Sequence, residues 1–187
     1  MATMREHRYV TPWGVGVIGT IGDAVVSVTP PIGRADAGST GLDAGIVDGG
    51  TAPAAARRLA GAIARYLAGD LAPIANRAEV ASWLTAAGVS GFRHDVSLAL
   101  FDVPVGVTIS YGELAALAGR PGAARAVGTT CARNPLPIVV PCHRVVHAGA
   151  RRGDVGSYGA ATGSDYKRRL LALEDAALVR PSGRVAP

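Results

Sequence analysis

The chain is poor in cysteine and lacks long apolar runs. Its 187 residues include only two cysteines, Cys131 and Cys142, which is too few for a disulfide framework. No Cys-x-x-Cys pair or histidine cluster has zinc spacing, so no metal site is expected. No stretch is long enough to span a bilayer, and Pro12 and Asp23 interrupt the early apolar residues, which argues against a targeting segment. A reduced, cytoplasmic protein without membrane contact is expected.

Positive charge is in excess. Lysine and arginine number 19 against 14 aspartates and glutamates, giving a formal net charge of +5. This balance favours an anionic partner such as nucleic acid, although an ordinary solvated basic surface fits the composition equally well. The length allows one domain or two small ones.

The N-terminal part starts as a predicted sheet. Apolar residues alternate with glycine over 13–17, and Gly22-Asp23 separates them from the apolar run 24–28, which predicts a hairpin. Residues 30–53 are rich in Gly, Asp, Ser and Pro without an apolar period, so a long, disordered surface loop is expected.

A helix is predicted after this loop. Leu59, Ile63 and Leu67 recur at helical spacing, and Gly69 marks the end. The arginines of this helix are expected on a solvated face: Arg57, Arg58 and Arg65. Residues 72–91 have mixed character, and the domain boundary is placed there.

The C-terminal part has clearer signals. Apolar residues at 96, 99, 100 and 103 predict a helix that stops before Pro104. Ser110 and Glu113 form a predicted capping box, which begins a helix that ends near Gly119. A second helix is expected from Ala123 to about Ala132. The two helices are a candidate helix-turn-helix, with an ordinary helical hairpin as the alternative.

Two side chains of this region suit nucleic acid. Arg125 projects from the first turn of the second helix among small residues and could reach into a duplex. Tyr111, in the first turn of the preceding helix, fits either core packing or a stacking and hydrogen-bonding platform.

The run Pro141-Cys-His-Arg is the clearest candidate for chemistry. Basic neighbours stabilise a thiolate, so Cys142 is a candidate nucleophile, with inert packing as the alternative. The preceding apolar run predicts an extended strand, on which adjacent side chains point to opposite faces. His143 could then take the thiol proton only through a local turn or a bridging water.

Several motifs occur together in the order and spacing of a known family. They are Ile109-Ser-Tyr-Gly-Glu-Leu-Ala-Ala-Leu-Ala-Gly, Ala123-Ala-Arg-Ala-Val-Gly, Asn134-Pro and Ile138-Val-Val-Pro-Cys-His-Arg-Val-Val. They resemble the O6-alkylguanine-DNA alkyltransferases, also called methylated-DNA-protein-cysteine methyltransferases. The likeness covers most of residues 91–174 and thins before them to Thr11-Pro-Trp-Gly and Tyr66-Leu-Ala-Gly.

The resemblance implies an α/β (α+β) fold with two domains. A small ribonuclease H-like sheet and helix domain is expected over residues 1–85, with the long loop at 30–53. A mainly helical DNA-binding and catalytic domain with the helix-turn-helix is expected over 86–180, followed by a tail at 181–187.

The resemblance also implies a DNA-repair activity. Such a protein flips O6-alkylguanine, and also O4-alkylthymine, out of double-stranded DNA and transfers the alkyl group irreversibly to its own Cys142. It would act once, without a cofactor, as a monomer in the cytoplasm of a bacterium, associated with the nucleoid. Cooperative binding along DNA stays open.

Site residues follow from the matched motifs. His143 would take the thiol proton through a water, and Glu174 would orient the imidazole from a helix that Ser164 caps. Packing of that helix is expected from Tyr166, Leu170, Leu173 and Ala177.

The remaining roles concern the flipped base. Arg125 would fill the vacated stack, and Tyr111 would rotate the nucleotide and donate to a ring nitrogen. Asn134 would tie the turn before the cysteine segment, and Arg144 would support the pocket wall. The pocket itself is expected from Tyr158, the Gly159 amide and the carbonyls of Cys142 and Val145.

Some features depart from the family pattern, and two other functions stay open. The segment 147–157 is longer than expected, and Ser97 stands where tryptophan is usual. A non-enzymatic damage sensor of the alkyltransferase-like kind would bind the lesion without transfer. In such sensors the reactive cysteine is replaced, so the presence of Cys142 argues against this function. A cysteine hydrolase would need a histidine remote in sequence and an oxyanion hole.

Overall fold

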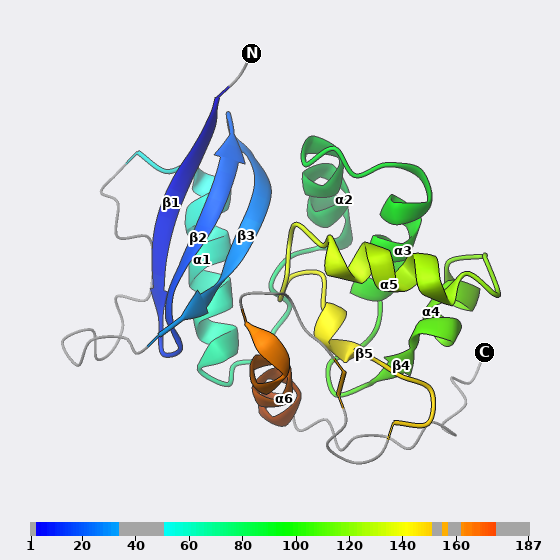
Figure 1. Cartoon of the computed structure of the whole chain (residues 1–187). Coiled ribbons are helices and arrows are strands. Elements are labelled where there is room, and N and C mark those ends of the chain that lie inside the picture. The colour runs from blue at the N-terminus through cyan, green and yellow to red at the C-terminus, as the bar shows by residue number, and fades with distance from the viewer. Residues whose placement is uncertain (1–2, 34–50, 151–154, 157–161, 175–187) are drawn as a thin grey trace. The chain divides into compact units, whose positions relative to one another are not determined.

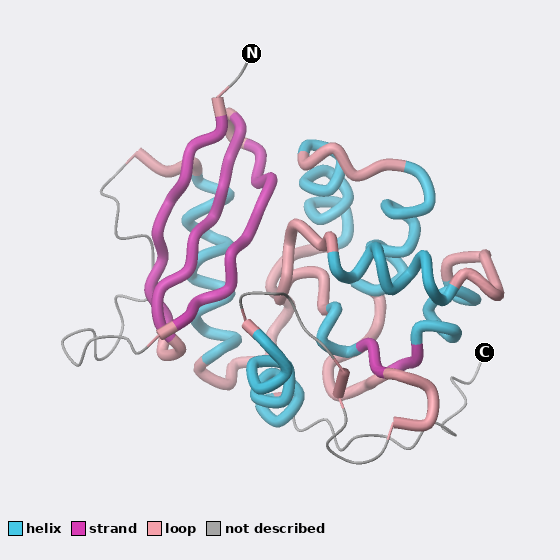
Figure 2. Tube along the Cα trace, viewed as in Figure 1, coloured by secondary structure: helices cyan, strands magenta, loops and turns pink. Residues whose placement is uncertain are grey.

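The computed structural model describes residues 3–33, 51–150, 155–156 and 162–174 (Figures 1 and 2). The chain divides into two compact units. Unit 1 comprises Met1–His94 and Pro135–Val140, and unit 2 comprises Asp95–Asn134 and Pro141–Pro187. Sheet and helix occur together, which confirms the α/β (α+β) class.

Unit 1 contains a three-stranded antiparallel sheet in the order β1-β2-β3. The strands are β1 (Met4–Thr11), β2 (Gly14–Ile21) and β3 (Ala24–Ile32), and β2 and β3 confirm the predicted hairpin. Gly22 takes a φ of 57° at the turn, a conformation that favours glycine. The sequence did not predict β1, because two of its inward residues, His7 and Thr11, are polar.

β3 extends further than expected. It continues through Pro30 and Pro31 to Ile32, so the loop predicted from residue 30 begins later. Proline is tolerated there because β3 is an edge strand. The rest of that loop, residues 34–50, lies outside the described residues.

Helix α1 (Ala54–Leu67) confirms the predicted helix and packs against the sheet. It buries Leu59, Ile63 and Tyr66, and Gly69 follows its end with a φ of 102°. Its three arginines are exposed, as expected. Two of them form surface ion pairs, Arg58 with Glu79 and Arg65 with Asp70.

Helix α2 (Arg77–Ala86) was not predicted. Asn76 and Glu79 form a capping box, with 2.9 Å from the Glu79 amide to Asn76 Oδ1 and 3.1 Å for the return bond. The sequence features from which α2 could have been predicted are this capping box and the helical spacing of Val80, Trp83 and Leu84, which are buried. A boundary after residue 85 would cut this helix, whereas the division falls between His94 and Asp95.

Residues 135–140 also belong to unit 1, which sequence order did not suggest. The amide of Val28 on β3 donates to the Pro135 carbonyl at 2.8 Å. This bond between distant parts of the chain joins the apolar segment before Cys142 to the sheet.

Unit 2 contains the predicted pair of helices. α3 (Gly91–Phe101) spans the division and ends before Pro104, as predicted. α4 (Tyr111–Leu117) and α5 (Ala124–Ala132) pack against each other, with the Ser110–Glu113 capping box at the start of α4. The two bonds of the box measure 3.2 Å to Ser110 Oγ and 2.6 Å to Glu113 Oε2.

The remaining elements of unit 2 frame the cysteine segment. Strands β4 (Ile109–Ser110) and β5 (Val145–Val146) pair in parallel, and a 3-10 helix, η1 (Cys142–Arg144), directly precedes β5. α6 (Gly163–Leu173) contacts η1. The part of the chain that is described contains no helix long and apolar enough to cross a membrane.

The expected cap of α6 is wrong. The N-cap is Thr162, without a side-chain cap bond, and Ser164 Oγ donates instead to the Gly156 carbonyl at 3.0 Å. Leu170 is buried, as predicted, whereas Tyr166 and Leu173 are half-buried and Ala177 lies outside the described residues.

Candidate active site

Cys142 lies in a turn rather than on the predicted strand. The Arg144 amide donates to the Pro141 carbonyl at 2.9 Å, and this bond closes the 3-10 turn over Cys142, His143 and Arg144. All three residues are buried. With three residues per turn, neighbouring side chains point about 120° apart. The local turn, one of the two alternatives that the sequence left open for proton transfer to His143, is therefore present.

The Cys142 sulfur has a polar neighbour. Asn134 Nδ2 donates to Cys142 Sγ at 3.2 Å, while the Asn134 backbone amide donates to the Cys131 carbonyl at 3.3 Å. The sequence predicted only that Asn134 ties a turn. The structure brings its side-chain amide to the sulfur itself, where a donor stabilises a thiolate.

His143 and Glu174, predicted to act together, are in contact. His143 Nε2 lies 2.8 Å from Glu174 Oε1, and both side chains are fully buried. Burial lowers the pKa of His143; the hydrogen bond and charge of Glu174 oppose this, while Arg144 and Lys167 add to it. The imidazole is therefore neutral at pH 7. Because a carboxylate only accepts, Nε2 carries the proton and Nδ1 keeps a lone pair.

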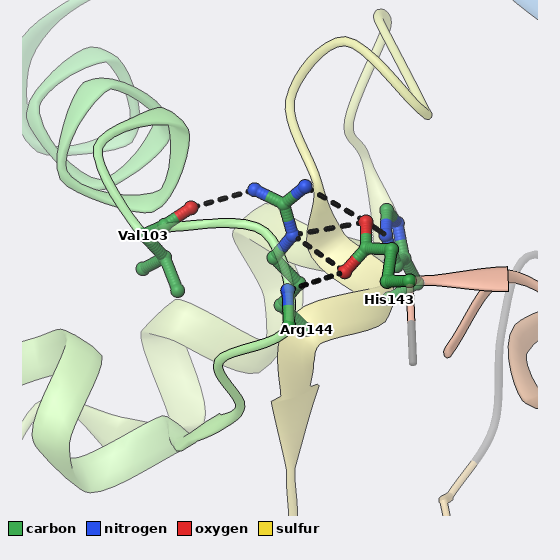
Figure 3. Close-up of polar contacts among 5 residues, drawn as sticks. Val103, His143 and Arg144 are labelled. Carbon is green, nitrogen blue, oxygen red and sulfur yellow. Dashed lines mark hydrogen bonds and ion pairs between the residues drawn. The ribbon is translucent and has the colours of Figure 1, made fainter. Parts of the chain in front are cut away.

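Arg144 fixes the carboxylate from the other side. Its Nη2 lies 2.7 Å from Glu174 Oε1, and its Nε lies 3.1 Å from both carboxylate oxygens. Its Nη1 donates to the Val103 carbonyl at 2.6 Å, as Figure 3 shows. The Gly106 amide adds a bond of 3.3 Å to Glu174 Oε2. Arg144 thus holds Glu174 in place, a role that sequence reasoning missed because the partner is remote in sequence.

Lys167 is a buried residue to which the sequence assigned no role. It is 1% exposed on α6, and its Nζ donates to the Val145 carbonyl at 2.6 Å. That carbonyl, predicted to accept from guanine, thus already accepts one bond and has a second lone pair. The available signal was a lysine in the apolar stripe that contains Leu170, Leu171 and Glu174.

Tyr111 begins α4 and is half-buried. Its ring centroid lies 5.3 Å from that of His147, with the planes tilted by 51°. Burial raises the pKa of Tyr111, and negative charge on Cys131 and Cys142 adds to the effect. The phenol therefore keeps its proton and can act as a donor.

Helix α5 has one exposed face of small and basic residues: Arg125, Ala126, Thr129, Ala132 and Arg133. Arg125 lies in the first turn, as predicted. Cys131 is half-buried, and burial raises the pKa of its thiol to about 12, so it stays protonated. A thiol that stays protonated suits packing rather than nucleophilic chemistry.

The predicted pocket wall is only partly visible. Tyr158 and Gly159 lie outside the described residues, as do residues 151–154 and 157 of the longer segment. Ser97 is buried in α3. No group of three His, Cys, Asp or Glu within the described ranges is placed to hold a metal ion.

Comparison with known proteins finds relatives of this site. Residues 91–176 match the family described as 6-O-methylguanine DNA methyltransferase, DNA binding domain. A methylated-DNA–protein-cysteine methyltransferase of Mycolicibacterium paratuberculosis is 52% identical over 85 residues, covering 46% of this chain and 48% of that protein. One from Salmonella typhimurium is 45% identical over 112 residues, covering 60% of this chain and 59% of that protein. The chain thus spans about half the length of the curated relatives it matches.

Solved structures extend the likeness to most of the chain. O6-methylguanine methyltransferase of Mycobacterium tuberculosis has a TM-score of 0.63 and 27% identity, covering 93% of this chain and 94% of that one. Mycobacterium tuberculosis OGT in complex with DNA has a TM-score of 0.62 and 28% identity, covering 94% of each chain. These comparisons confirm the resemblance seen in the sequence, which covers residues 91–176 by the family match and most of the chain by the solved structures.

Proposed function

We propose that this protein repairs double-stranded DNA by transferring the alkyl group of O6-alkylguanine to Cys142, which is consumed in the reaction. The observation that carries the proposal is the arrangement around the sulfur. Asn134 donates to Cys142 Sγ, and the next residue, His143, is a buried neutral imidazole bonded to Glu174. The names of the matched relatives support the same chemistry.

The transfer begins with proton removal. His143 Nδ1 accepts the Cys142 proton through a bridging water, because neighbouring side chains of the 3-10 turn diverge. Glu174 stabilises the imidazolium that forms, and Arg144 prevents the carboxylate from turning away. The Asn134 amide stabilises the thiolate.

The thiolate then attacks the alkyl carbon in line with its bond to O6. A carbon–sulfur bond forms as the carbon–oxygen bond breaks, and the electron pair leaves with the guanine. Tyr111 donates its proton to a ring nitrogen of that anion and regains one from the His143 imidazolium. The products are S-alkylcysteine and guanine, so the thiol proton ends on the base and no cofactor is consumed.

The lesion must leave the base stack to reach the sulfur, at a cost of a few kcal/mol. Arg125, exposed on α5, fills the vacated space, and the small residues around it allow close approach to DNA. We assign recognition of the base to Tyr158 and the Gly159 amide on the strength of the matched motifs alone, and to the carbonyls of Cys142 and Val145, which accept from the exocyclic amine. We assign DNA binding and catalysis to unit 2.

Several finer features belong to the same proposal. O4-alkylthymine is a second substrate, because it presents an alkyl group on a comparable exocyclic oxygen. The protein acts as a monomer on DNA in the cytoplasm.

Intact-protein mass spectrometry after incubation with O6-methylguanine duplex DNA tests the proposal. We expect the protein to gain one methyl group, at most once per molecule, and Cys142→Ala to gain none. Cys131→Ala is the matched control and should be methylated as the unchanged protein is, because the Cys131 thiol stays protonated. An unchanged mass together with tight lesion binding would replace the proposal by a damage sensor.

A further inference from the structure

His147 is a residue that neither the family motifs nor the proposed chemistry uses. It directly follows β5, five residues after Cys142, and its ring lies against Tyr111 with a centroid separation of 5.3 Å. The residue is exposed overall, so this ring contact is not a consequence of burial in the core.

A second contact holds the same ring from the far end of the segment. A Cβ atom placed on Gly156 would lie 2.9 Å from His147 Cδ2 and 3.0 Å from Nε2. The imidazole therefore lies against Gly156, and a side chain at this position would force the ring to move. Gly156 also has a φ of 70°, which favours glycine for a separate reason.

Both ends of this contact are anchored in unit 2. Ser164 Oγ on α6 donates to the Gly156 carbonyl at 3.0 Å, and the neighbouring Val155 is 2% exposed. The Ala150 amide donates to the His147 carbonyl at 3.1 Å, which turns the chain just after β5. His147 is thus held between α6, through Gly156, and the first turn of α4, through Tyr111.

We infer that His147 is a positioning residue that braces the Tyr111 ring for base rotation and proton donation. The inference rests on the proposed function, in which Tyr111 donates to the leaving guanine. A tilted aromatic pair changes an equilibrium between ring orientations by about 2- to 10-fold. His147 acts only through Tyr111 and touches no reacting atom.

The first test is the rate of methyl transfer to Cys142 from duplex DNA, followed by intact mass. His147→Ala should slow transfer by about 2- to 10-fold, as should His147→Leu, whereas His147→Phe keeps an aromatic ring and should stay within about twofold of the unchanged protein. His94→Ala removes a histidine of α3 in unit 1 and should leave the rate unchanged.

A double-mutant cycle then separates bracing from a general effect on the fold. In a Tyr111→Ala background, His147→Ala should cause no further slowing, because the ring that it braces is gone. An equal slowing in both backgrounds would overturn the inference, as would a full rate in His147→Ala or a His147→Phe protein as slow as His147→Leu.

Ring resonances of Tyr111, assigned with Tyr111→Phe, provide a readout that does not depend on activity. They should shift in His147→Ala and His147→Leu but much less in His147→Phe, and unshifted resonances would contradict the brace. Failure of the unchanged protein to gain a methyl group would instead overturn the proposed function, and the resonances would still test the contact.

Discussion

The two units bury different kinds of polar group. In unit 1, the buried polar residues within the described ranges are His7, Thr11 and Thr20, and His7 Nε2 lies 3.1 Å from Thr20 Oγ1. In unit 2, the described part of the chain buries an arginine, a lysine and a glutamate: Arg144, Lys167 and Glu174. Burying charge costs several kcal/mol per ion unless partners offset it. Each of these buried charges in unit 2 has such a partner: Arg144 pairs with Glu174, and Lys167 donates to the Val145 carbonyl.

The ion pairs of the two units differ in their exposure to solvent. Arg58 and Glu79 of unit 1 leave 64% and 32% of their side chains exposed, whereas Arg144 and Glu174 of unit 2 leave 8% and 0%. An exposed pair contributes about 0–1 kcal/mol. Removing one partner of a buried pair leaves the other charge buried without its counterion. Substitution of Glu174 should therefore cost more stability than substitution of Glu79.

Glu174→Ala should have the largest effect. It leaves the Arg144 guanidinium buried without its carboxylate and should lower the free energy of unfolding by about 3–5 kcal/mol. Glu79→Ala, the matched change in unit 1, removes a capping box and an exposed pair and should cost about 1 kcal/mol. Urea unfolding measures both, and equal losses would show that burial of the carboxylate is not what matters.

Asn134→Ala and Asn76→Ala compare two asparagines whose side chains bond to different groups. Loss of the Asn134 bond to the Cys142 thiolate should slow methyl transfer by about 1.5–3 kcal/mol, or roughly 10- to 150-fold. Loss of the Asn76 cap of α2 should cost about 1 kcal/mol of unfolding free energy and leave transfer unchanged. Single-turnover rates and urea unfolding separate these effects. Slower methyl transfer in both variants would contradict the assignment of Asn134 to the reaction and of Asn76 to stability alone.

Local chemistry allowed the sequence to predict much of the fold. The Ser110–Glu113 box, Gly69 and the residue before Pro104 act within a few residues of themselves, so the bounds of α1, α3, α4 and α5 follow closely from the sequence. β1 was not predicted because two of its inward-facing residues are polar, which hides the apolar alternation. His7 is bonded to Thr20 Oγ1, and Thr11 Oγ1 donates to the Gly14 carbonyl.

The site depends more on contacts between distant residues. Its residue types were predictable from the cysteine motif, but the turn at Cys142 was not, because an apolar run before it also suits a strand. Arg144 is bonded to Glu174 thirty residues later and to Val103 forty-one residues earlier. No local pattern encodes such pairings, so the role of Arg144 required the structure.

The pH dependence of stability should reveal the buried imidazole. Because burial lowers the folded-state pKa of His143 below 6.5, the unfolded chain binds more protons as the pH falls, and stability is lost below pH 6.5. The unchanged protein should lose up to about 1.4 kcal/mol per pH unit more than His143→Asn in this window. Urea unfolding between pH 7 and pH 5 measures the difference, and parallel curves would mean that His143 titrates normally. The acidic limb of methyl transfer should likewise lie below pH 6.5.

Arg125→Ala and Arg65→Ala should change the folded protein least, because both residues lie exposed on helices and surface substitutions shift stability by less than about 0.5 kcal/mol. Their effects on repair should nevertheless differ. In the proposed function Arg125 fills the vacated stack, so Arg125→Ala should slow methyl transfer from duplex DNA by about tenfold, which corresponds to about 1.4 kcal/mol of the flipping cost. Reaction with free O6-benzylguanine needs no flipping and should survive, while Arg65→Ala should alter neither rate. A comparable loss on duplex and free base would show that Arg125 supports the site itself, and the exposed face of α5 would then have no separate role in opening the duplex.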